Sequence, residues 1–309
     1  MKPPLHEAAR QRRLVADGAM GTALMAAGLE SGGCGEFWNV AHPEKILDIQ
    51  RRYAQAGADC LITNTFGGSR IMLKRHGHAD QVKEINQAAV RIAREAFGGG
   101  GRDGWVLGDI GPLGALLEPY GDLSEAAARA ALEEQAAALV DAGADAIIIE
   151  TETSLEETGL AIDAAKAAGA RSVVASFAYD LSTDGSFYVT MMGVLPDRAA
   201  LFMEERGADV AGLNCGTSMD MGAVAAVVRA YRAAVQLPTM GQPNAGNPAL
   251  VNGKVVYRQT PAEMAVALPD VLEAGTNIIG SCCGSTYEHT AVIRRAVDAF
   301  NQRHGAAGD

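Results

Sequence analysis

One short pattern recurs along the chain and constrains its fold more than any other feature. A glycine follows an alanine or arginine, and a short, continuous apolar run begins two or three residues later. The pattern occurs at residues 56–63, 142–149, 168–175, 206–213 and 274–279. Glycine favours the left-handed conformation that ends a helix, and short apolar runs are typical of parallel strands covered on both faces. The repeat therefore predicts helices that alternate with buried parallel strands.

Three further apolar runs extend this set to eight strands. They lie at residues 14–16, 105–108 and 238–241, and helix-like segments separate the runs. Strands that alternate with helices through right-handed crossovers form either an open sheet or a closed barrel. Eight units in 309 residues favour the barrel. We expect an α/β fold, a (β/α)8 TIM barrel, with residues 1–309 as a single domain.

The ends of the predicted strands differ in chemistry. The Ala-Gly-Ala-Asp connectors precede the strands, whereas nearly every strand is followed by polar or metal-binding residue types. These are Asp17, Asn64, Asp109, Glu150, Ser176, Asn214, Cys215, Gln242, Asn244, Cys282 and Cys283. Active sites of such barrels lie at the carboxyl ends of the strands. The asymmetry therefore predicts an enzyme with its site at that end.

Three of the five cysteines fall at these strand ends. Cys215 follows the sixth predicted strand, and Cys282 and Cys283 follow the eighth, so one strand separates them. Three sulfur ligands leave one position of a zinc ion open, which distinguishes a catalytic from a structural site, and soft ligands favour zinc over magnesium or manganese. The alternatives are small buried apolar side chains or a disulfide between the adjacent pair.

Charge and cysteine content bound the partners and the compartment. A net charge of −11 argues against nucleic acid or an anionic membrane as the partner. The sequence has no apolar run of about 18 residues, as a membrane span needs, and no apolar signal segment at its start. With an odd number of cysteines, five, we expect a reducing cytoplasm, where clustered cysteines more often bind metal than form disulfides.

Several motifs occur together in a known order. They are Asp17-Gly18-Ala19-Met20-Gly21-Thr22, Thr63-Asn64-Thr65-Phe66, Asp109-Ile110-Gly111-Pro112, Glu150-Thr151, Asn214-Cys215-Gly216 and Gly280-Ser281-Cys282-Cys283-Gly284. In these motifs the chain resembles the homocysteine S-methyltransferase family, which includes betaine–homocysteine methyltransferase and the homocysteine-binding module of cobalamin-dependent methionine synthase. The resemblance spans almost the whole chain. Ser281 departs from it, because the family usually has glycine there.

The resemblance implies a homocysteine-binding barrel. Cys215, Cys282 and Cys283 would hold zinc, and the thiolate of homocysteine would be the fourth ligand. Asp17 and Glu150 follow strands and can supply anions for the substrate amino group, a role that the resemblance also assigns to them. Taken alone, Asp17 is equally compatible with a turn residue.

Two further residues are candidates for substrate binding. Asn214 directly precedes Cys215 and belongs to the same motif. Trp38 lies in the loop after the first predicted strand, on the side of the site, where its ring could hold a cationic methyl donor by cation–π attraction. An aromatic lid packed on the barrel explains Trp38 equally well.

These residues predict a zinc-dependent methyltransferase that forms methionine from homocysteine. The expected donor is a small onium compound such as betaine or S-methylmethionine. Alternatives are transfer from a separate corrinoid protein, methylation of a different thiol, and a zinc-stabilised scaffold or thiol sensor without enzymatic activity. The sequence leaves both a monomer and a homo-oligomer open.

Overall fold

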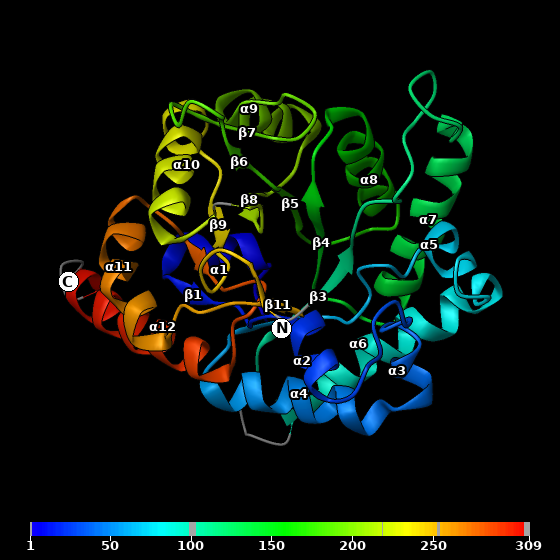
Figure 1. Cartoon of the computed structure of the whole chain (residues 1–309), viewed down its shortest axis with the longest axis horizontal. Helices are drawn as coiled ribbons and strands as arrows, with labels where there is room; N and C mark the ends of the chain where they lie inside the picture. Colours follow the sequence, from blue (N-terminus) through cyan, green and yellow to red (C-terminus); the bar gives the residue numbers. More distant parts are fainter. Residues whose placement is uncertain (1, 99–102, 218, 252–253, 306–309) are drawn as a thin grey trace.

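The computed structural model describes residues 2–98, 103–217, 219–251 and 254–305, and eight parallel strands form its centre (Figure 1). These strands are β1 (Leu14–Val15), β2 (Cys60–Ile62), β3 (Trp105–Ile110), β4 (Ala146–Glu152), β5 (Val173–Phe177), β8 (Val210–Asn214), β9 (Thr239–Gln242) and β12 (Ile278–Ile279). They pair in the order β1-β12-β9-β8-β5-β4-β3-β2. All eight predicted strands are confirmed.

The two ends of this order also meet, so the sheet closes on itself. Ala16 forms a parallel bridge with Cys60. The Asp17 amide donates to the Cys60 carbonyl at 3.1 Å, and the Asp59 amide donates to the Val15 carbonyl at 2.7 Å. The predicted (β/α)8 barrel is therefore confirmed.

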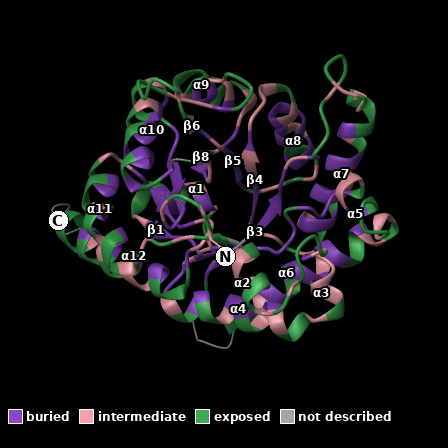
Figure 2. Cartoon of the chain, in the orientation of Figure 1, coloured by how far each residue is buried: buried purple, intermediate pink, exposed green. Residues whose placement is uncertain are grey.

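Helices surround the barrel and bury their inner faces against it (Figure 2). The outer helices are α4 (Pro43–Ala56), α6 (Val82–Gly98), α7 (Glu125–Asp141), α8 (Leu155–Ala167), α9 (Pro196–Arg206), α10 (Met221–Ala234), α11 (Pro261–Glu273) and α12 (Tyr287–Gly305). The glycine of each repeat has a positive φ, between 78° at Gly207 and 108° at Gly57. Each of these glycines therefore ends a helix, as the repeat predicts. No helix of the described residues has the length and hydropathy needed to cross a bilayer.

Helix α1 (Leu5–Gln11) closes the amino-terminal end of the barrel, a feature that the sequence pattern did not predict. Its Leu5 and Ala9 are fully buried and belong to the same apolar cluster as the side chains that fill the barrel, such as Leu107 and Ile148. With that end filled, the carboxyl end is the open side of the barrel.

The aspartate of the repeat has a structural role at the start of the strands. Asp59 accepts a hydrogen bond from the Val15 amide at 2.9 Å, Asp145 from Val106 at 2.8 Å and Asp209 from Val173 at 2.8 Å. Asn277 does the same for Thr239 at 3.0 Å. We call these four contacts the strand-start hydrogen bonds. Each ties a strand to the strand that precedes it along the chain.

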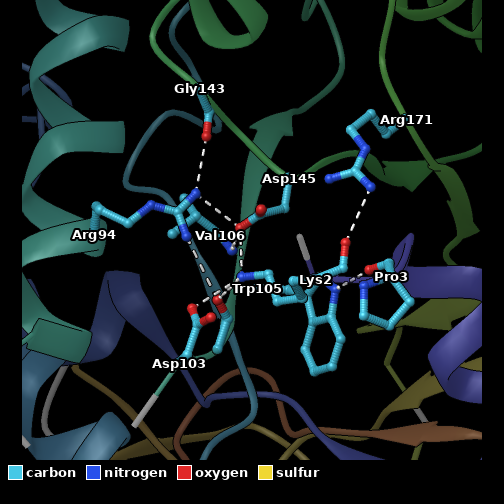
Figure 3. Close-up of polar contacts among 10 residues, drawn as sticks. Lys2, Pro3, Arg94, Asp103, Trp105, Val106, Gly143, Asp145 and Arg171 are labelled. Carbon is cyan, nitrogen blue, oxygen red and sulfur yellow. Dashed lines mark hydrogen bonds and ion pairs between the residues drawn. The ribbon is translucent and has the colours of Figure 1, made fainter. Parts of the chain in front are cut away.

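The chain's first residues bind across this closed end (Figure 3). The Lys2 ammonium lies 3.2 Å from an Asp145 carboxylate oxygen, and the Arg94 guanidinium lies 2.8 Å from the same oxygen. The Trp105 indole donates to the Pro3 carbonyl at 3.0 Å, and Arg171 donates to the Lys2 carbonyl at 3.1 Å. Charged residues therefore stabilise the end that is remote from the predicted site.

Additional elements lie in the connections. They are α2 (Met20–Ala26), α3 (Trp38–Ala41), α5 (Arg70–Lys74), η1 (Ala79–Gln81), the hairpin of β6 (Asp180–Leu181) and β7 (Tyr188–Val189), and the hairpin of β10 (Ala249–Val251) and β11 (Lys254–Val256). Each lies between a barrel strand and the next outer helix, and the apolar pattern of the sequence did not predict the two hairpins. These insertions therefore enlarge the carboxyl end, where the candidate site lies.

Candidate active site

Cys215, Cys282 and Cys283 come together at the carboxyl end of the barrel. Cys215 directly follows β8, and the other two lie just beyond β12. The Cys215 and Cys283 sulfurs are 3.8 Å apart, the Cys282 and Cys283 sulfurs are 3.9 Å apart, and all three lie within 4.8 Å of one another. The predicted convergence of the three side chains is therefore present.

The local backbone explains how three cysteines reach one point. Cys215 has a φ of 52° and Gly216 a φ of 88°, so the chain turns sharply as β8 ends. The Cys215 amide donates to the Gln242 carbonyl at 3.2 Å, and the Cys282 amide donates to the Pro243 carbonyl at 2.6 Å. Strand β9, which lies between β8 and β12, thus holds both cysteine segments in place.

The spacing of the sulfurs fits a single tetrahedral metal ion. With zinc–sulfur bonds of about 2.3 Å and tetrahedral angles, two sulfurs on one zinc ion are about 3.8 Å apart. A disulfide would require about 2.05 Å, and all five cysteines are unpaired. The adjacent pair therefore forms no disulfide, and the three sulfurs can hold a metal ion with one position left for a substrate.

The three thiols interact strongly even without an ion. Hydrogen bonds from Cys215 and then from Cys282 lower the pKa of Cys283 to about 3. Donating to a neighbouring sulfur raises the pKa of Cys282, and burial adds to the increase. For Cys215, the contact with Cys282 lowers the pKa, but the contact with Cys283 and burial outweigh it and raise the pKa to about 11. The three thiols therefore influence one another's ionisation, and Cys283 is the most acidic of them.

Tyr257 packs over the cluster, and sequence reasoning missed it. Tyr257 helps to lower the pKa of Cys283, and its side chain lies so close to Gly284 that a Cβ there would be 2.1 Å from the Tyr257 Cβ. Tyr257 follows β11, in a long insertion after β9. No local motif marks it, because its position depends on how that insertion folds back.

The loop of the adjacent cysteines is tied to its surroundings by two side chains. The Ser285 hydroxyl donates to the Cys282 carbonyl at 2.7 Å and accepts from the Ala19 amide at 3.1 Å. His289 accepts at Nδ1 from the Thr286 amide at 3.1 Å, so its Nε2 carries the proton and donates to the Gln259 carbonyl at 3.0 Å. These contacts fix the loop against the first connection and the Tyr257 segment.

Three carboxyl groups line the barrel next to the sulfurs. Asp17 accepts from the Ile62 amide at 2.8 Å through one oxygen, while its other oxygen is buried without a hydrogen-bond partner among the described residues. Burial raises the pKa of Asp17 well above its usual range. Burial, followed by the charge of Cys283, raises the pKa of Glu150 to about 7, and Glu150 is hydrogen-bonded to Asp109. These carboxyl groups make this end of the barrel suited to a cationic group.

An irregularity in β4 directs Glu150. The register between β4 and β5 shifts between Ile149 and Glu152, and Thr151 has a φ of 64°. Such a bulge re-aims a side chain and is common beside active sites. Asn214 stabilises it, because its carbonyl oxygen accepts from the Thr151 amide at 3.1 Å and its amide donates to the Thr151 hydroxyl at 2.7 Å.

Asn214 is fully buried, and its carbonyl oxygen also accepts from the Ser176 hydroxyl at 2.6 Å. The contacts of this side chain are therefore with the protein itself. Substrate binding by Asn214 stays a prediction. In this structure its side chain positions Thr151.

Trp38 begins the short helix α3, and the Lys45 ammonium lies 4.4 Å from the centroid of its ring. The Lys45 ammonium thus already occupies one face of the Trp38 ring, which disfavours binding of a second cation on that face. Tyr179, which lies just beyond β5, is no alternative, since it is fully buried and its hydroxyl bonds to that of Tyr231 at 2.8 Å. The predicted donor-binding role of Trp38 is not tested by these contacts.

Comparison with known proteins gives consistent matches. The model of the family described as homocysteine S-methyltransferase matches residues 14–297. Methionine synthase of Mycobacterium tuberculosis is 34% identical over 302 residues, which covers 93% of this chain and 25% of that protein. Methionine synthase of Mycobacterium leprae is 32% identical over 312 residues, with 96% and 25% coverage. The chain thus spans about a quarter of the length of these curated relatives.

Solved structures share the fold. The homocysteine methyltransferase MmuM from Escherichia coli, in a metallated form, superposes with a TM-score of 0.75 at 24% identity, covering 93% of this chain and 96% of that one. Its oxidized form gives a TM-score of 0.73 at 25% identity, with 92% and 95% coverage. A pyruvate carboxylase from Rhizobium etli gives 0.56 at 14% identity, covering 97% of this chain and 28% of that chain, a likeness of fold alone.

Proposed function

The chain belongs to the homocysteine S-methyltransferase family, and from this premise we propose that it methylates the thiol of homocysteine to form methionine. The observation that carries the proposal is the spacing of Cys215, Cys282 and Cys283, which fits one tetrahedral ion. We propose that this ion is zinc, and that residues 1–309 act as one homocysteine-binding domain. The unpaired state of all five cysteines supports the expected reducing cytoplasm.

The cysteines and the two carboxyl groups have different roles in the proposed methyl transfer. Zinc bound to the three cysteines would keep the substrate thiol deprotonated at neutral pH. Asp17 and Glu150 offer negative charge to the α-ammonium group, which orients the substrate sulfur toward the cysteines. In the transfer, a new sulfur–carbon bond forms, the bond between methyl and donor breaks, and its electron pair leaves with the donor. The chain needs no separate general base for this step.

We propose a small onium compound, such as betaine or S-methylmethionine, as the methyl donor. The carboxyl groups of buried Asp17 and half-buried Glu150 support a cationic ligand, since neither forms an ion pair with a basic side chain among the described residues. Trp38 remains a candidate contact for the onium group, and Lys45 would have to move from its ring.

A second candidate is transfer from a separate corrinoid protein, and the surface around the site favours it. Within the described ranges, the exposed large apolar side chains lie in the segments between a barrel strand and its outer helix or at the start of α12, except Leu201 and Val266. Phe187, Met191 and Leu250 are examples, with exposures of 48%, 76% and 76%. These side chains lie at the end of the barrel where a protein that delivers methyl groups to the site would dock.

One experiment tests both candidates. Purified, zinc-loaded protein is incubated with homocysteine and either betaine or S-methylmethionine, and methionine is measured by mass spectrometry. Catalytic formation of methionine supports the onium candidate. If homocysteine binds but neither donor gives methionine, the corrinoid candidate is favoured. If homocysteine does not bind, the proposed function is wrong.

The matched variants separate the cluster from the other cysteines. Cys215→Ser removes one of the three sulfurs, and we expect loss of both zinc and methionine formation. Cys34→Ser changes a partly buried cysteine outside the cluster, and we expect it to retain both. Equal behaviour of the two variants would contradict the role given to the cluster.

A further inference from the structure

Asp109 is a buried carboxyl group at the site for which neither the sequence nor the comparisons give a role. In β3, Trp105 and Leu107 point into the barrel and belong to its interior cluster, whereas Val106 and Ile110 belong to the cluster outside it. Because side chains alternate along a strand, Asp109 also points inward. It is 3% exposed and lies nearest the open end.

Glu150 reaches the same place from the neighbouring strand. Asp109 is paired in register with Ile148 of β4, an interior residue, and Glu150 lies two positions further toward the open end. The two carboxyl groups are hydrogen-bonded to each other. They form a contact between adjacent strands at the open end of the barrel.

The backbone of Asp109 is fixed firmly. Its amide donates to the Thr63 hydroxyl at 3.0 Å, and its carbonyl accepts from the Thr65 hydroxyl at 2.7 Å and from Gln135 at 3.1 Å. Its Oδ1 is buried and has no hydrogen-bond partner among the described residues. The side chain therefore has little freedom, and its contact with Glu150 is its main polar interaction.

Two carboxyl groups in contact cannot both be ionised without a large cost, so such a pair holds one proton between them. Burial and the neighbouring Glu150 charge raise the pKa of Asp109 well above its usual range. Because Asp109 is buried and Glu150 is only half-buried, the shared proton favours Asp109, which can then donate to the Glu150 carboxylate.

We propose that Asp109 is a positioning residue, whose carboxyl group holds the Glu150 carboxylate in the orientation that binds the α-ammonium group of the thiol substrate. The inference rests on the proposed function, because it takes Glu150 as the ammonium-binding residue. Asn214 fixes the Glu150 backbone through Thr151, and Asp109 fixes its side chain. The two supports together leave Glu150 one direction in which to bind.

The test compares two thiols that differ only in the amino group, homocysteine and 4-mercaptobutyrate. Their dissociation constants for zinc-loaded protein are measured by calorimetry. Asp109→Leu keeps the approximate shape but donates no hydrogen bond, and Asp109→Asn keeps a donor. Glu152→Gln is the matched control, since Glu152 is another buried carboxyl group of β4 but bonds to Thr158 instead.

We expect Asp109→Leu to weaken homocysteine binding about tenfold, the effect of roughly one hydrogen bond, and to leave 4-mercaptobutyrate binding unchanged. Asp109→Asn should stay within about threefold of the parent protein for both thiols, since its amide still donates one hydrogen bond. Glu152→Gln should affect neither. Equal losses for the two thiols in Asp109→Leu would mean a merely structural role, and no loss for either would also overturn the proposal.

Two further measurements keep the test decisive. Glu150→Gln must weaken homocysteine but not 4-mercaptobutyrate; if it does not, the proposed role of Glu150 fails rather than that of Asp109. If Asp109→Leu does not fold, infrared difference spectra of the parent protein and Asp109→Asn decide. The carboxylic acid band should shift on homocysteine binding in the parent protein and not in the variant, and no shift in the parent overturns the proposal.

Discussion

Asn214 offers the sharpest test of how the site is held, because its side chain bonds to residues of two other barrel strands, Ser176 of β5 and Thr151 of β4. Asn214→Ala removes the acceptor of the Thr151 amide and the Ser176 hydroxyl, and the donor to the Thr151 hydroxyl. At about 1 kcal/mol per hydrogen bond the loss is about 3 kcal/mol. The two hydroxyls can rotate toward other partners, but the Thr151 amide cannot.

The left-handed conformation of Thr151 partly offsets this loss. Relaxation of its backbone would recover about 1 kcal/mol of strain, but it would also move the adjacent Glu150. We therefore expect the free energy of unfolding to fall by about 2–3 kcal/mol, together with a higher KM for homocysteine. Urea unfolding at neutral pH in the presence of a chelator measures the first effect without a contribution from metal binding.

Gln242→Met is the control for stability. Gln242 is equally buried on the neighbouring strand β9, but its side-chain oxygen has no hydrogen-bond partner among the described residues. Its replacement should change the free energy of unfolding by less than about 1 kcal/mol. A similarly small change in Asn214→Ala, with a normal KM, would refute the view that Asn214 holds the bulge.

Three other predictions concern metal, pH and salt. Cys282→Ala should lose zinc, measured by elemental analysis, and methionine formation, and a zinc-loaded, active variant would exclude the proposed site. Burial, followed by the charge of Cys283, raises the pKa of Glu150 in the folded protein to about 7. Its contribution to the free energy of unfolding is therefore fully present below its pKa in the unfolded chain, and it is lost as the pH rises through about 7. In urea unfolding without metal, the stability of Glu150→Gln relative to the parent protein should therefore increase from pH 5 to pH 8. A difference in the free energy of unfolding that does not change with pH would contradict this. Asp145→Asn should cost about 1 kcal/mol, since it removes the ion pairs with Lys2 and Arg94, and in thermal unfolding the difference should shrink at high salt.

The barrel could be predicted from the sequence because each of its signals is local. A glycine that ends a helix and an apolar run that forms a buried strand lie within a few residues of each other, as at Gly143 and Ile147. The convergence of Cys215 with Cys283 also followed, since it depends only on the order of the strands in a closed barrel.

The remaining features of the site depend on contacts between distant segments. The bulge at Thr151 requires Asn214, which is 63 positions away, and nothing near Thr151 in the sequence indicates a positive φ. Tyr257 reaches Cys283 only because an insertion folds back over Gly284. The pairing of Asp109 with Glu150 needs the register of two strands, which the apolar pattern alone does not determine.

The four strand-start hydrogen bonds divide the closed end of the barrel into modules. Each joins partners separated by only 36 to 44 positions, and each stays within one pair of consecutive barrel strands. A break in the chain between two such pairs, for example between α8 and β5, would leave all four bonds within intact segments. We therefore expect circular permutants opened at that point to fold, whereas an opening between β3 and β4 would separate Val106 from Asp145.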